Sequence, residues 1–132
     1  MIRRYARERA STLLRRLAYR MNRAARLRDA DSIHDLRVAI RRFEQCLQIF
    51  NQFFPGHKKI HRRLHKIMQL SGEVRNRDIA LDLLKQAGQT AHSALAERLR
   101  CERKDFQAEL LATFDQWGER DVFRKWGSRL GL

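Results

Sequence analysis

The sequence predicts an all-α protein, an antiparallel four-helix bundle with a short C-terminal helical segment. Two observations favour this fold class. Apolar residues recur at steps of three and four through most of the 132 residues, which is the spacing of one face of an α-helix. Proline occurs once and strand-like alternation is nearly absent, so long helices joined by short turns are expected. We expect residues 1–132 to form a single helical-bundle domain.

The first two expected helices span about residues 2–28 and from about 31 to 52. Asp31 or Ser32 is the expected cap of the second helix, because both residue types accept from free N–H groups at a helix start. The first helix carries an apolar stripe of Ala6, Ala10, Leu13, Leu17, Met21 and Ala24. The second carries Ile33, Leu36, Ile40, Phe43, Leu47 and Phe50.

A turn at Pro55-Gly56 precedes the third expected helix, which runs from about His57 through Leu70. The residues expected to face the core are Ile60, Leu64, Ile67 and Ser71. Ser71-Gly72 is a candidate break or kink, after which residues 78–87 continue as helix until Gly88. Asp78 either caps that stretch or pairs with an arginine.

The fourth expected helix covers about residues 90–117 and ends at Gly118. Its stripe comprises Leu95, Leu99, Phe106, Leu110, Phe114 and Trp117. A last segment, 121–130, places Val122, Phe123, Trp126 and Leu130 at helical spacing. This apolar tail either packs back on the bundle or belongs to an interface.

The charge is large and unevenly distributed. The formal net charge is +14; residues 1–66 hold 18 Lys and Arg against 5 Asp and Glu, whereas residues 67–132 hold 11 against 10. No acidic residue occurs from Gln45 to Gly72. A surface that serves only solubility mixes the two signs, so this segregation indicates an anionic partner: nucleic acid, a phosphate polymer or an acidic membrane surface.

Several other classes of protein are disfavoured by the sequence. Cys46 and Cys101 lie in helical patterns outside any ligand cluster, which indicates buried, reduced thiols in a cytosolic protein. We find no apolar run of membrane-spanning length and no signal-peptide pattern. The residues also form no phosphate-cradling glycine loop and no nucleophile–histidine arrangement, so we expect a binding protein with no catalytic residues and no cofactor.

Helix two presents a second face beside its apolar stripe. At about 100° per residue, the row of His34, Arg37 and Arg41 lies about 90–150° from the centre of the stripe. Arginine matches phosphate oxygens bidentately and stays charged at any working pH. We therefore expect this row to contact an anionic ligand. The alternative is that His34 satisfies a local hydrogen bond while the arginines are only solvated.

The third helix adds a second set of cations. Lys59, Arg63 and Lys66 form a row beside its apolar stripe, and Arg62 points further into solvent, so we take the first three as ligand contacts and Arg62 as secondary. Arg75 and Arg77 extend the basic surface. Rows from the second and third helices together would make a basic groove that captures a polyanion. The three histidines at 57, 61 and 65 have helical spacing but no nearby carboxylate or cysteine, so no metal site is expected.

The motif His34-x-x-Arg37-Val38-x-x-Arg41-Arg42, followed by Phe50 and then by Arg77-Asp78 with Leu81 and Leu84, resembles the CHAD family, the conserved histidine α-helical domain. The resemblance covers about residues 13–117. It implies non-catalytic binding of inorganic polyphosphate, with His34, Arg37, Arg41 and Arg42 lining a basic channel beside basic residues of the third helix. Typical members resemble two four-helix bundles related by an approximate twofold, whereas this chain has the length of one.

The resemblance therefore leaves three arrangements open: two chains pair to rebuild the channel, the chain is a fragment, or one bundle binds on an open face. A homodimer, a phosphate-metabolism enzyme as partner, and a cytoplasmic location associated with polyphosphate granules are the accompanying expectations. The alternative function is that of a basic helical nucleic-acid-binding protein. Against it, no helix-turn-helix pattern is present and no aromatic residue lies among the basic rows to stack bases.

Overall fold

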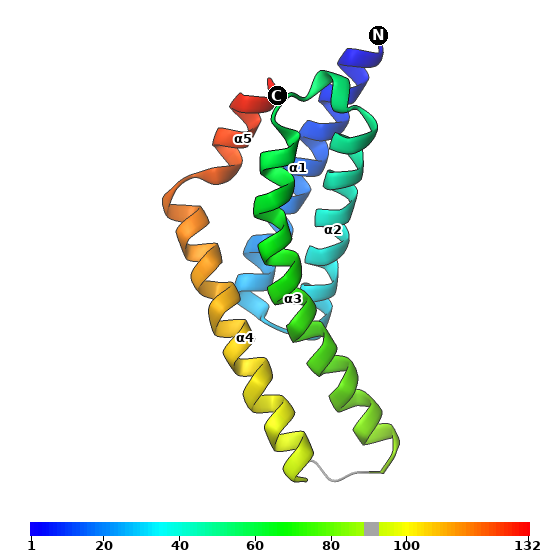
Figure 1. Ribbon diagram of the computed structural model, residues 1–132, viewed down its shortest axis with the longest axis vertical. Coiled ribbons are helices and arrows are strands. Elements are labelled where there is room, and N and C mark those ends of the chain that lie inside the picture. Colours follow the sequence, from blue (N-terminus) through cyan, green and yellow to red (C-terminus); the bar gives the residue numbers. More distant parts are fainter. Residues whose placement is uncertain (89–92) are drawn as a thin grey trace.

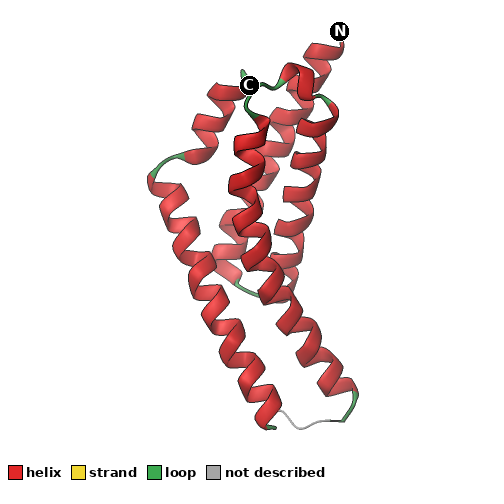
Figure 2. Ribbon diagram, viewed as in Figure 1, coloured by secondary structure: helices red, strands yellow, loops and turns green. Residues whose placement is uncertain are grey.

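The computed structural model describes residues 1–88 and 93–132. Within those ranges all regular structure is helical (Figure 2), which confirms the all-α prediction. The elements in chain order are α1 (Ile2–Leu27), α2 (Ala30–Ile49), the 3-10 turn η1 (Asn51–Phe53), α3 (His57–Gln86), α4 (Ala94–Glu119) and α5 (Val122–Leu130).

The helices pack as antiparallel neighbours in chain order. α1 packs against α2, α2 against the first half of α3, and α4 against α3 (Figure 1). α5 lies at the end of α4 and returns to contact α1. α3 and α4 continue past the turn between α1 and α2, so their far parts pair only with each other in Figure 1. We call residues 79–86 of α3 and 94–99 of α4 the distal arm.

The predicted apolar stripes form the core. Every predicted core residue of α1 and α3 is buried, as is the α2 stripe except the partly buried Phe50. The α4 stripe is divided: Leu110, Phe114 and Trp117 are buried, whereas Leu95 is 50% exposed. The difference arises because Leu95 lies on the distal arm, where α1 and α2 do not cover it.

The apolar tail packs back on the bundle, which decides between the two expected arrangements. Val122, Trp126 and Leu130 of α5 are buried. The Trp126 ring stacks at 6.4 Å from Phe43 of α2 and lies edge-on at 5.2 Å from Trp117 of α4. The tail is therefore part of the core and offers no support for pairing between chains.

Two boundaries around α2 differ from the prediction. Asp29, rather than Asp31 or Ser32, is the cap, because its Oδ1 accepts from the Ser32 backbone N–H at 2.9 Å. The helix ends at Ile49 rather than near Gln52, since the chain tightens there into η1.

Of the break or kink expected at Ser71-Gly72, the break does not occur, because α3 is continuous from His57 to Gln86. The Ser71 hydroxyl donates back to the Ile67 carbonyl at 2.6 Å, which satisfies it inside the helix. Gly118 likewise does not end α4, which runs to Glu119.

Two further expectations concern α4. The start predicted near Thr90 lies outside the described residues; the described helix begins at Ala94, and the Ser93 hydroxyl accepts from the Ala96 N–H. Cys46 is buried as expected, but Cys101 is exposed because it lies on the outer face of α4.

Candidate anion-binding face

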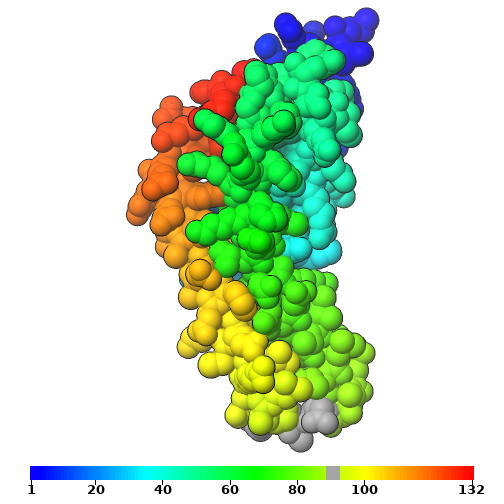
Figure 3. Space-filling model, viewed as in Figure 1, coloured from blue at the N-terminus to red at the C-terminus, as the bar shows by residue number. Residues whose placement is uncertain are grey.

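The basic residues of α2 and α3 are brought together by the antiparallel packing of these two helices. Arg37 of α2 lies opposite Ser71 of α3, and Glu44 lies opposite His61. In the space-filling view α3 runs down the middle of the visible face, with α2 on one side and α4 and α5 on the other (Figure 3). α3 therefore has two shoulders, one toward α2 and one toward α4 and α5.

Arg37 links α2 to α3. Its Nη1 donates to the Met68 carbonyl at 2.6 Å and to the Ser71 hydroxyl at 3.0 Å. Burial is the main cause that lowers the pKa of Arg37, and the nearby positive charges of Arg41 and Arg75 lower it further. Arg37 is thus a partly buried cation whose side chain is fixed by α3, and it has two other arginines as neighbours.

Gly72 provides the space that Arg37 occupies. A Cβ atom added at Gly72 would lie 2.9 Å from Arg37 Nη1, which is closer than unbonded atoms of this kind pack. A glycine inside a helix normally costs about 1 kcal/mol relative to alanine. Its presence here is explained by the guanidinium that lies against it.

Arg37, Arg41 and Arg75 form what we call the central arginine cluster. Arg41 is exposed and Arg75 is partly buried. Within residues 1–88 and 93–132, no carboxylate forms an ion pair with any of the three. Like charges held together without a counterion repel one another, and an anion that binds there relieves the repulsion. His34 is exposed one turn before Arg37 on the same helix.

Arg42 lies away from this cluster. It is seven residues after Asp35 and so lies on the same row of α2, and Asp35 contacts Arg20 of α1 at 3.5 Å. Arg42 is therefore exposed on the α1 side of α2, about 100° round the helix from Arg41.

The lysine and arginine row of α3 faces the other shoulder. His61 marks the α2 side of α3, because its Nδ1 lies 3.5 Å from Glu44 Oε1. Lys59, Arg63 and Lys66 lie about 140–160° round the helix from His61, and all three are exposed. The predicted groove required this row to lie beside Arg37 and Arg41. The packing of α2 on α3 places it on the opposite side of α3 instead.

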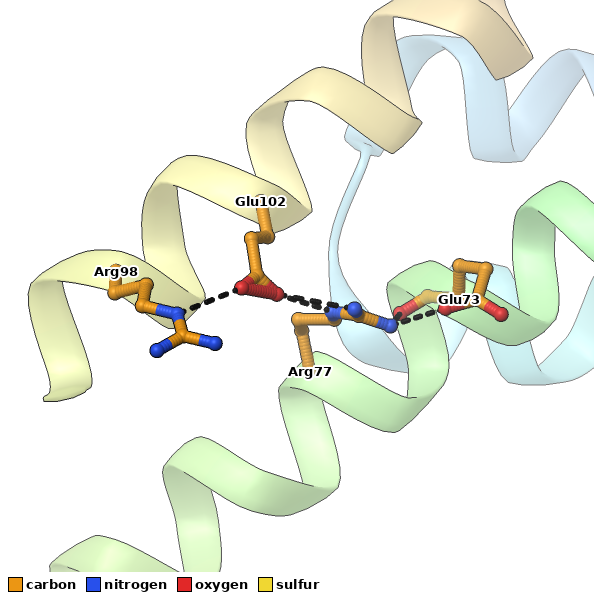
Figure 4. A network of polar contacts seen from close by, with 4 residues as sticks. All are labelled: Glu73, Arg77, Arg98 and Glu102. Carbon is orange, nitrogen blue, oxygen red and sulfur yellow. Dashed lines mark hydrogen bonds and ion pairs between the residues drawn. The ribbon is translucent and has the colours of Figure 1, made fainter.

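Arg77 has acidic partners. Its guanidinium pairs with Glu73 on α3 and lies 3.0 Å from Glu102 on α4, and Glu102 also accepts from Arg98 (Figure 4). These carboxylates, Glu102 first, raise the pKa of Arg77. Its guanidinium also lies 4.8 Å from the Phe106 ring. Arg77 thus connects α3 to α4, and its charge is compensated.

Asp78 forms the second link between α3 and α4. The Arg103 Nε donates to its carboxylate at 2.6 Å, and both side chains are largely buried. Of the two expected roles for Asp78, pairing with an arginine is the one that the structure shows. Sequence reasoning had not identified Arg103, because the partner is 25 residues away on another helix.

A basic hollow lies at the start of α3, which we call the α3–α5 hollow. It has a volume of about 610 Å³, and its basic lining residues are His57, Lys58, Lys59, Arg62 and Arg129. The sequence singles out His57 as one of three spaced histidines, Lys59 as a ligand contact and Arg62 as a secondary one. Arg129 was missed, because only the return of α5 to the bundle brings it to α3.

Glu44 is the acidic residue of α2 that lies against α3. Burial raises its pKa, while the nearby His61 and His65 act in the opposite direction.

The described residues contain no group of three or more His, Cys, Asp or Glu that could hold a metal ion. No helix among them is long and apolar enough to span a bilayer.

The fold and this face define a helical-bundle domain with a cationic surface on α2 and α3. The chain belongs to the CHAD domain family, whose model matches residues 8–131. That family is associated with binding of polyphosphate and is a family of binding domains rather than of catalysts. No curated protein and no solved structure matches the chain.

Proposed function

We propose that this protein binds inorganic polyphosphate on the face formed by α2 and α3, without catalysis. The observation that carries the proposal is the central arginine cluster: three arginines from two helices converge with no paired carboxylate among the described residues, in a chain of the CHAD family. Polyphosphate has closely spaced negative charges and no bases, so rows of arginine and lysine suffice to recognise it.

The central contacts in this proposal are Arg37, Arg41 and Arg75, with His34 beside them. Arg37 is held in place by α3, so little side-chain freedom is lost when it meets a phosphate. The flanking contacts are Lys59, Arg62, Arg63 and Lys66, which are exposed on the outer side of α3 and on its α4 shoulder. Arg42 and Arg77 are peripheral, since Arg42 points toward α1 and Arg77 is paired with two carboxylates.

The direct test is calorimetric titration with long-chain polyphosphate. Arg41→Ala combined with Arg75→Ala should weaken binding at least tenfold, because it removes two of the three cluster charges and leaves the Arg37 link intact. Arg16→Ala combined with Arg120→Ala is the matched control, since Arg16 is exposed on α1, Arg120 is exposed in the turn after α4, and the charge loss is equal. Equal losses in the two variants would indicate diffuse attraction rather than a site.

Competition with double-stranded DNA separates this function from nucleic-acid binding. At equal phosphate concentration, polyphosphate should displace DNA and DNA should displace little polyphosphate. Binding should fall steeply with added salt, because phosphate contacts release condensed counterions. If DNA competes equally well, the proposed specificity is wrong. Incubation with polyphosphate, with and without Mg²⁺, should release no phosphate.

We further propose that two copies pair through the distal arm. Ile79, Leu83 and Leu95 are 44%, 58% and 50% exposed there. Ile79 and Leu83 line a hollow of about 870 Å³ together with Asp82 and Lys85, and Arg75 of the central arginine cluster lies at its edge toward the basic face. A patch that carries apolar groups and both signs of charge can complement itself across a twofold axis, unlike the basic face. A phosphate-metabolism enzyme as a further partner stays a prediction.

Solution mass measured by light scattering tests the pairing. Leu83→Glu combined with Leu95→Glu should convert a dimer to a monomer. Ile49→Glu is the control, because Ile49 is 73% exposed at the far end of α2. A monomeric wild-type protein, or a dimer unaffected by the double substitution, would contradict this assignment.

A further inference from the structure

The α3–α5 hollow has the composition of an anion site that is separate from the central arginine cluster. Four basic side chains come from the first two turns of α3 and one, Arg129, from the last turn of α5. The other lining residues are Asn51, Pro55 and Gly56, so no carboxylate lines the hollow. The basic groups come from two helices that are far apart in the sequence, so the hollow depends on the folded structure.

The turn before α3 shapes this hollow. Gly56 has φ of +87°, a left-handed conformation that favours glycine, and Arg129 Cδ lies 3.6 Å from where a Gly56 Cβ would be. His57 Nδ1 lies 3.1 Å from the Phe54 carbonyl, which ties the imidazole to the same turn. Trp126, one turn before Arg129, is 2% exposed in the core and fixes α5. The two walls of the hollow are therefore both anchored.

The distance between the hollow and the central cluster is set by α3 itself. Lys59 and Arg75 are 16 residues apart on one continuous helix, which corresponds to a rise of about 24 Å along the axis at 1.5 Å per residue. They also lie about 160° apart round the helix, so a chain that reaches both winds round α3. Arg62 and His65 are exposed between them. No acidic residue occurs in α3 before Glu73, and the partly buried Glu44 of α2 faces His61. A flexible polyanion therefore meets no exposed carboxylate of α3 along this path.

We propose that the α3–α5 hollow is a second polyphosphate site, and that the two sites together select long chains over short ones. The inference rests on the proposed function. A short oligophosphate fills either site alone. A chain longer than the separation binds both, and its second contact is intramolecular, which raises affinity without any new type of interaction. Lys59, Arg62 and Arg129 are the residues assigned to this site.

The test compares tripolyphosphate with long-chain polyphosphate on the wild-type protein and two variants. The hollow variant is Lys59→Ala combined with Arg129→Ala, and the cluster variant is Arg41→Ala combined with Arg75→Ala. The wild type should bind two tripolyphosphates, and each variant should bind one. The hollow variant should bind long-chain polyphosphate at least tenfold more weakly than the wild type. It should still bind one tripolyphosphate at the central arginine cluster, with the affinity that the wild type has there.

The outcomes separate the two claims. If the cluster variant loses long-chain binding and the hollow variant behaves like the Arg16→Ala, Arg120→Ala control, the second site is wrong and the proposed function stands. If neither variant differs from that control, both fail. Both substituted residues of the hollow variant are exposed, so its thermal unfolding should match the wild type. Arg129→Lys, which keeps the charge, should recover most of the long-chain affinity.

Discussion

The contact between Gly72 and Arg37 makes a quantitative prediction about stability. Replacing a glycine inside a helix by alanine normally stabilises a protein by about 1 kcal/mol. In α3 the new Cβ would lie 2.9 Å from Arg37 Nη1, so the guanidinium must shift away from it. We expect this shift to cost the guanidinium the equivalent of one of its two hydrogen bonds, to the Met68 carbonyl and the Ser71 hydroxyl.

Whether Gly72→Ala raises or lowers the free energy of unfolding depends on which is larger, the gain from replacing glycine inside a helix or the loss of hydrogen bonding by Arg37. One hydrogen bond made by a charged group contributes about 1.5–3 kcal/mol. The loss of one such bond, offset by the gain of about 1 kcal/mol from replacing glycine, should leave Gly72→Ala less stable than the wild type by about 1 kcal/mol. In an Arg37→Ala background the obstruction is gone, and the same substitution should stabilise by about 1 kcal/mol. The coupling free energy between the two sites is then about 2 kcal/mol, within the range for residues in contact.

Urea unfolding followed by circular dichroism measures this cycle, because a domain of this size generally unfolds in one step. Gly118→Ala is the matched control: Gly118 is also helical, and nothing lies within 4 Å of its added Cβ. Gly118→Ala should stabilise the wild type and the Arg37→Ala variant by the same amount. If Gly72→Ala also stabilises both equally, Arg37 does not occupy the space beside Gly72 and the account of the α2–α3 link is refuted.

Three other predictions use the same measurement. Burial raises the pKa of Glu44 above its ordinary 4.5. Ionised Glu44 therefore lowers the free energy of unfolding, and this loss increases as pH rises from 4.5 through the folded pKa. Glu44→Gln should be more stable than the wild type at pH 8, and the difference should vanish toward pH 4. Hydrogen bonds from Arg77 and Arg98 lower the pKa of Glu102 below 4.5. The stability that ionised Glu102 contributes is therefore present above pH 4.5 and is lost as pH falls through the folded pKa. Glu102→Gln should weaken the decrease in the free energy of unfolding at acid pH, and an unchanged decrease would contradict the network. Trp126→Ala should lower the free energy of unfolding by about 3–5 kcal/mol, because Trp126 packs against Phe43, Trp117 and Phe123. Trp126→Phe should lower it less. A loss below about 1 kcal/mol for Trp126→Ala would mean that α5 is not anchored.

Helix existence and core faces could be predicted from the sequence because both follow from local periodicity. Ile33, Leu36 and Ile40 must share one side of any α-helix that contains them, and such a side has to be buried. Boundaries were less predictable, because neighbouring residues compete to cap a helix: Asp29, Asp31 and Ser32 are all suitable, and the geometry of the turn selects Asp29.

The break expected at Ser71-Gly72 failed for a tertiary reason. Both residues are poor helix formers in isolation, and local propensity is all that a sequence window contains. In the folded protein Ser71 bonds to α3 itself and receives a bond from Arg37, which also lies against Gly72. The two contacts with Arg37 join residues more than thirty positions apart, so no window around Gly72 indicates them.

The basic residues show most clearly where sequence reasoning ends. Periodicity places His61 and Lys59 on different sides of α3, but it does not say on which side α2 packs. That choice depends on the direction in which the chain turns between α2 and α3. The observed packing puts the His61 side against α2 and leaves Lys59, with Arg62, beside Arg129 of α5. The turn around Gly56 therefore divides the cations of α3 between two places, where the sequence alone suggested one groove.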